Sequence, residues 1–84
     1  MHESTNEIVW AEALFVSDIQ EGDAPDGERV RRTVESVLRR DGPDGCAAEV
    51  AYEFGEHPDT AARRMAWALR MVRALVRSAA RRAA

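Results

Sequence analysis

The sequence predicts an all-α domain of four helices, over residues 6–20, 25–40, 46–54 and 58–82. Three observations support this fold class. Apolar residues recur three and four positions apart through each segment, which is the spacing of one helical face. Clusters of glycine, proline and aspartate separate the segments, as turns require. The chain has 84 residues, of which 45% are hydrophobic, and this composition suits one small globular domain.

The first helix is predicted over residues 6–20 and is acidic. Ser4 and Glu7 fit a capping box at its start. We expect Gly22 to end it. Its apolar stripe consists of Ile8, Ala11, Phe15 and Ile19, widened by Trp10 and Leu14.

The second helix is predicted over residues 25–40, with Pro25 in its first turn. Gly42 is expected to take a left-handed conformation that stops the helix, and Pro43 to prevent its continuation. The buried stripe consists of Val30, Val34, Val37 and Leu38.

The third helix is short, over residues 46–54, and Gly55 is expected to end it. The fourth helix follows over residues 58–82, with His57 at the cap position and Pro58 in the first helical position. Its apolar seam consists of Ala61, Met65, Ala68, Val72, Leu75 and Ala79. Arginines gather on the opposite side, namely Arg63, Arg70, Arg77 and Arg81.

Charge is distributed unevenly along the chain. The net charge is −3, yet residues 60–84 hold seven arginines and no acid, whereas residues 1–28 hold eight acids and no arginine. Such asymmetry indicates either an anionic partner for the basic end or neutralisation of one end by the other. On the second interpretation, the acidic helix within residues 1–22 would mask the arginines of the last helix.

Several functional classes find no support in the sequence. Cys46 is the only cysteine, so no intrachain disulfide or thiolate metal cluster can form, and we expect a reducing cytoplasmic location. The polar start is not that of a signal peptide, and no apolar run has transmembrane length. No phosphate-binding loop or nucleophile motif is present. We therefore expect no enzymatic activity, no cofactor, no metal site and no membrane association.

One stretch, residues 47–65, resembles the helix-turn-helix superfamily of small bacterial DNA-binding regulators. Ala51 matches the small residue at the helix crossing, and Gly55 matches the glycine of the turn. The apolar positions of the motif are matched by Val50, Phe54, Ala61 and Met65. Glu56 and Asp59 depart from the pattern because they add negative charge near the surface that would face DNA.

The resemblance implies that the last three helices form a helix-turn-helix-like unit, within residues 25–84, that binds double-stranded DNA. Arg63 and Arg64 would point outward and contact bases or phosphates, and Thr60 would hold a phosphate. Arg31, Arg32 and Arg70 would add phosphate contacts. Useful affinity would require a homodimer, whose seam the long helix could supply.

The alternative is a helical module for protein–protein interaction or dimerisation. In this hypothesis the long arginine-rich helix docks on an acidic partner or on a second copy of the chain. Trp67 and Met71 lie between the arginines and the apolar seam. Exposure of these two side chains would favour a protein partner over DNA. With Arg77, these two residues form the predicted partner-binding set.

Overall fold

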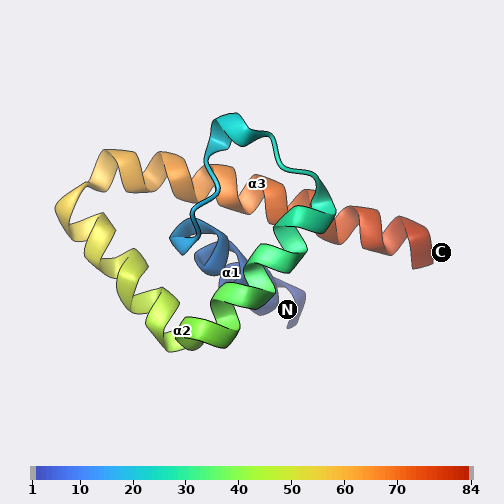
Figure 1. Ribbon diagram of the computed structural model, residues 1–84, viewed down its shortest axis with the longest axis horizontal. Helices are drawn as coiled ribbons and strands as arrows, with labels where there is room; N and C mark the ends of the chain where they lie inside the picture. Colours follow the sequence, from blue (N-terminus) through green and yellow to red (C-terminus); the bar gives the residue numbers. More distant parts are fainter. Residues whose placement is uncertain (1, 84) are drawn as a thin grey trace.

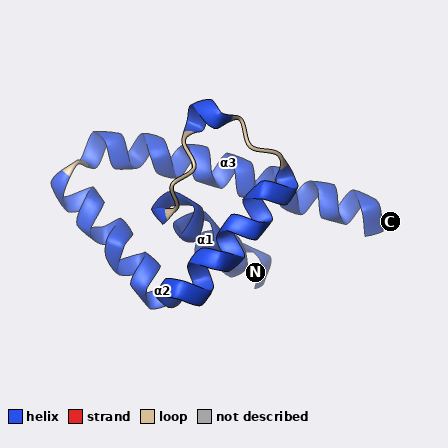
Figure 2. Cartoon of the chain, viewed as in Figure 1, coloured by secondary structure: helices blue, strands red, loops and turns tan. Residues whose placement is uncertain are grey.

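The computed structural model describes residues 2–83, and side chains from residue 6 onward. It contains three α-helices and one short 3-10 helix, η1 (Glu21–Asp23). The α-helices are α1 (His2–Val16), α2 (Gly27–Glu56) and α3 (Pro58–Ala83). Figure 2 shows that helix dominates and that no strand occurs in this part of the chain. The all-helical fold is confirmed, but the predicted count of four helices is wrong.

The two middle helices of the prediction are one bent helix, α2. The break lies at Gly42, whose φ of 73° and ψ of 164° are non-helical and are readily adopted only by glycine. Figure 1 shows the two arms of α2 meeting at a sharp angle. Helix resumes at once because Pro43 is well suited to the first turn of a helical segment. The predicted loop over residues 41–45 therefore does not form.

Three other boundaries differ from the prediction. Helix α1 begins at His2 and not at residue 6, so Ser4 lies within the helix and the predicted capping box with Glu7 is wrong. Helix α1 ends at Val16, well before Gly22, and the hydroxyl of Ser17 donates to the carbonyl of Leu14 at 2.6 Å. Helix α2 begins after Asp26, not at Pro25, because the Asp26 side chain accepts a hydrogen bond from the backbone N–H of Arg29 at 2.9 Å. A local polar side chain thus contributes at the end of α1 and sets the start of α2.

The core lies where the three α-helices meet. Leu14 of α1, Val34 of α2 and Val72 of α3 are completely or almost completely buried there. The predicted seam of α3 is confirmed at Ala61, Ala68 and Val72, which are all buried. Leu14, Val34, Ala68 and Val72 belong to one cluster, here called the main cluster. Its other members are Ala11, Ala13, Ile19, Val30, Val37, Cys46 and Trp67. A second, smaller cluster of Phe15, Val50 and Ala61 lies near the junction of α2 and α3.

Helices α2 and α3 are joined by a single residue, His57. Its N–H donates to the carbonyl of Glu53, four residues earlier, at 2.7 Å. The helical hydrogen bonds of α2 therefore continue past Gly55. Its carbonyl accepts from Ala61 at 2.8 Å, as predicted for a cap. Pro58 causes the turn, because a residue before proline is disfavoured in helical conformation. The expectation that Gly55 ends the helix is therefore wrong.

No helix in residues 2–83 is both long and apolar enough to cross a membrane.

Candidate functional site

Three arginines of α3 lie exposed on its outer side. Arg63, Arg70 and Arg77 are spaced seven residues apart, so they follow one side of the helix. None of the three forms an ion pair with any of residues 6–83. We call these three residues the arginine face. Acids of α1 reach a different arginine, through a pair of Glu7 with Arg73 at 3.5 Å, so this face is not masked by the described side chains of α1.

Arg64 has a different role from its neighbours. Its Nε donates to the carbonyl of Phe15 at 2.7 Å. Its Nη2 donates to the carbonyls of Ser17 at 2.9 Å, Ile19 at 3.0 Å and Leu14 at 3.3 Å. The guanidinium also lies over two aromatic rings, with its carbon 5.8 Å from the centroid of Phe15 and 5.1 Å from that of Trp67.

These contacts make Arg64 the cap of α1. The last carbonyls of a helix have no partner within the helix and carry partial negative charge. The last turn of α1 contains no basic residue of its own, so a side chain from α3 supplies the donors. Burial lowers the pKa of the Arg64 guanidinium from its usual value, yet arginine remains charged at neutral pH. The expectation that Arg64 points outward is therefore wrong.

Trp67 is a core residue, not part of an exposed partner surface. Only 5% of its surface is exposed, and it belongs to the main cluster with Leu14 and Ile19. The chain after α1 crosses α3 in Figure 1, and Ile19 comes from this segment. Met71 is half-buried and packs against the same cluster. Of the predicted partner-binding residues only Arg77 is exposed, so Trp67 and Met71 form no exposed apolar strip for a partner.

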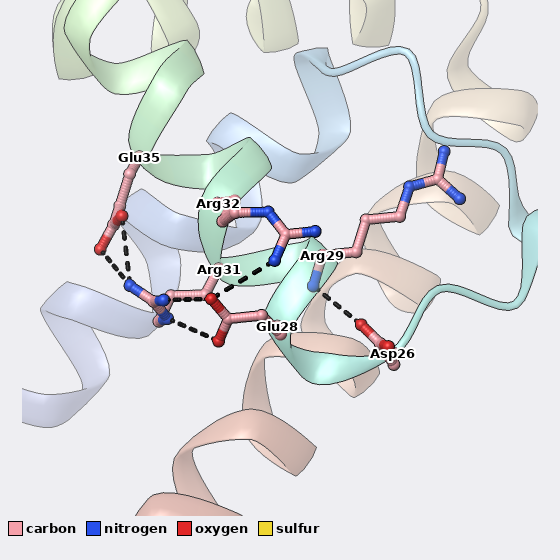
Figure 3. A network of polar contacts seen from close by, with 6 residues as sticks. All are labelled: Asp26, Glu28, Arg29, Arg31, Arg32 and Glu35. Carbon is pink, nitrogen blue, oxygen red and sulfur yellow. Dashed lines mark hydrogen bonds and ion pairs between the residues drawn. The ribbon is translucent and has the colours of Figure 1, made fainter.

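Arg31 and Arg32 are engaged by acids of their own helix. Figure 3 shows Glu28 between these two arginines, paired with Arg31 and lying 3.4 Å from a guanidinium nitrogen of Arg32. Arg31 also contacts Glu35 at 3.2 Å. The hydrogen bond from Arg31 lowers the pKa of the Glu28 carboxyl. Arg31 and Arg32, which were predicted to contact phosphates, therefore already have carboxylate partners within α2.

Thr60 and Arg63 are exposed in the first two turns of α3, as the helix-turn-helix resemblance implies. The supposed close crossing is absent, however. Ala51 is exposed, and a Cβ added at Gly55 would meet no atom within 4 Å. The junction is instead held by Phe54, which stacks on Phe15 with the ring centroids 6.3 Å apart.

A negatively charged segment leads into α3. Residues 43–59, here called the acidic arm, hold five acids and no arginine, namely Asp44, Glu49, Glu53, Glu56 and Asp59. None of these carboxylates pairs with a cation within residues 6–83. The arm buries Cys46 and Val50, while Tyr52 is 62% exposed. The molecule thus carries two adjoining, oppositely charged and unpaired surfaces.

The described side chains offer little for metal chemistry. Among them, no group of three or more His, Cys, Asp or Glu residues is placed to hold a metal ion. Cys46 is fully buried, and burial raises the pKa of its thiol. It therefore packs as a small apolar residue, as predicted.

Comparisons with protein-family models, curated proteins and solved structures give no match.

Proposed function

We propose that this chain is a non-enzymatic interaction module that binds an acidic protein surface through the arginine face of α3. The observation that carries the proposal is the exposure of Arg63, Arg70 and Arg77 on one side of one helix, without ion-pair partners in residues 6–83. A rise of about 1.5 Å per residue places the first and third of them roughly 21 Å apart along the axis. That length suits an extended partner, such as a helix, better than a small ligand.

Arginine is well suited to this task. Its planar guanidinium forms paired hydrogen bonds with carboxylates, and it is less strongly hydrated than lysine. Alanines lie beside the arginine face at Ala62, Ala66 and Ala74, and all three are exposed. Their small side chains let another helix approach closely enough for the guanidinium groups to reach its carboxylates.

DNA binding through the helix-turn-helix-like unit is the second candidate. The observation that favours it is the exposure of Thr60 and Arg63 near the N-terminus of α3, where backbone N–H groups can hold a phosphate. Against it, three of the six expected contact residues, Arg31, Arg32 and Arg64, are engaged within the molecule. Fewer contacts than the resemblance implies are therefore free for DNA.

One titration separates the two candidates. A labelled, glutamate-rich helical peptide and a labelled DNA duplex would each be titrated with the protein at low salt. Replacing Arg63, Arg70 and Arg77 with glutamine should weaken peptide binding by roughly 10–100-fold, since each exposed charge contributes about 0.5–1 kcal/mol. We expect little binding of wild type to the duplex.

The matched control removes three exposed arginines from α2, as Arg29→Gln, Arg32→Gln and Arg39→Gln. It has the same net charge as the first variant but keeps the arginine face. Peptide binding should then fall by less than about threefold, which is well under 1 kcal/mol. Equal losses in the two variants would contradict a localised site. Tight duplex binding that depends on Arg63 and Thr60 would favour the second candidate instead.

A further inference from the structure

The fold leaves two complementary surfaces unsatisfied in the same molecule. The acidic arm carries five carboxylates and the arginine face three guanidinium groups, and neither set pairs with the other within residues 6–83. Geometry explains this. The part of the acidic arm that lies in α2 diverges from α3 at His57 in Figure 1, and of its five acids only Asp59 lies on α3. The arm also turns Cys46 and Val50 toward the core. Glu49 and Glu53 border a hollow shared with Thr60 and Arg64, away from Arg70 and Arg77.

We propose that the partner of the arginine face is the acidic arm of a second copy of this chain. This inference rests on the proposed function and names its partner. Each copy carries both surfaces, so a two-fold arrangement would use each of them once per chain and close at two copies. Charge complementarity selects the occupant, because the acidic arm holds no arginine that would be repelled.

Tyr52 strengthens the argument for the acidic arm. At 62%, it is the most exposed large hydrophobic side chain among residues 6–83, and it lies among the acids of the arm. Tyrosine is a frequent anchor of protein interfaces, and its ring can stack on a guanidinium group. Apart from its acids and the 39% exposed ring of Phe54, the arm presents small exposed residues, namely Ala47, Ala48, Ala51 and Gly55. Two such helices can approach closely around one aromatic anchor.

The first test is the solution mass of the wild-type chain. Light scattering after size exclusion would be run over a range of protein concentrations, at low salt and at about 1 M NaCl, where charges are screened beyond roughly 3 Å. The chain has a mass of 9.4 kDa. A mass near twice this value at high concentration and low salt, falling toward the monomer value at high salt, is the expected result. A monomer at every concentration and salt would overturn the proposal.

The second test reverses charge on each surface separately. One variant carries Arg63→Glu, Arg70→Glu and Arg77→Glu, and the other carries Asp44→Arg, Glu49→Arg and Glu56→Arg. Each alone should be monomeric, and an equal mixture should recover the dimer mass because each copy then meets an opposite charge. Circular dichroism checks that both remain helical. A mixture that stays monomeric while wild type dimerises would overturn the assignment of these surfaces.

The peptide titration distinguishes this inference from the proposed function. If wild type is monomeric but binds the acidic peptide through the arginine face, self-association is refuted and the proposed function stands. If neither peptide binding nor association depends on the arginine face, both are refuted. If the dimer forms, added peptide should dissociate it in competition, because peptide and acidic arm occupy the same arginines.

Discussion

Replacing Arg64 with leucine is expected to lower the free energy of unfolding by about 2–4 kcal/mol. The side chain caps four backbone carbonyls, and a buried acceptor left without a partner costs about 1–3 kcal/mol. Leucine retains part of the packing against the rings of Phe15 and Trp67, so the loss reports chiefly on the hydrogen bonds. Urea denaturation followed by circular dichroism, at one fixed low protein concentration, measures it.

Two further variants sharpen this prediction. Arg64→Lys keeps the charge but not the planar fork, so we expect it to recover less than half of the lost stability. Arg63→Leu alters an exposed neighbour and should change stability by no more than about 0.5 kcal/mol. Equal effects at the two adjacent arginines, or full rescue by lysine, would show that Arg64 acts through charge alone.

Replacing Trp67 with alanine is expected to cost about 3–5 kcal/mol, because it empties a large site in the main cluster. It also removes the ring beneath the Arg64 guanidinium, so the two substitutions should not be additive. The same denaturation experiment measures the loss, and Ile8→Ala serves as control because Ile8 is 54% exposed. If Trp67→Ala left stability unchanged and only weakened partner binding, Trp67 would be a surface residue after all.

Local features of the fold could be read from the sequence because local chemistry determines them. Gly42 has the predicted positive φ, which is unfavourable for other side chains, although it bends α2 where the prediction had the helix stop. Pro58 begins α3 and His57 caps it, as proline at the first position and a cap before it require. The spacing of Ala61, Ala68 and Val72 correctly identifies the buried side of α3.

Long-range contacts could not be read in this way. Arg64 caps carbonyls 45 to 50 residues earlier in the chain, and no local pattern signals that pairing. Trp67 lies off the helical seam, but the segment containing Ile19 covers it. The end of α1 at Val16 was missed for the same reason, because a cap supplied by α3 is invisible in the sequence of α1. The position of Arg64 at the edge of the apolar seam, beside exposed Arg63, is the one available hint.

The sequence also could not show which arginines are free. Seven arginines lie in residues 60–84, and a helical projection gives their direction but not their partners. The structure divides them by their partners: Arg64 holds carbonyls, Arg73 pairs with Glu7, and the arginine face remains exposed. That division supports the proposed interaction role, in which residues 47–65 form a corner that starts α3.

The most direct test of this division is an NMR titration that follows the Nε–H signals of the arginine side chains as the acidic peptide is added. Signals of Arg63, Arg70 and Arg77 should shift together with increasing peptide. The Arg64 signal should stay in place and exchange slowly with water, because its Nε–H already donates to the carbonyl of Phe15. A shift of Arg64 equal to theirs, or none at the arginine face while peptide is bound, would contradict the assignment of structural and binding arginines on α3.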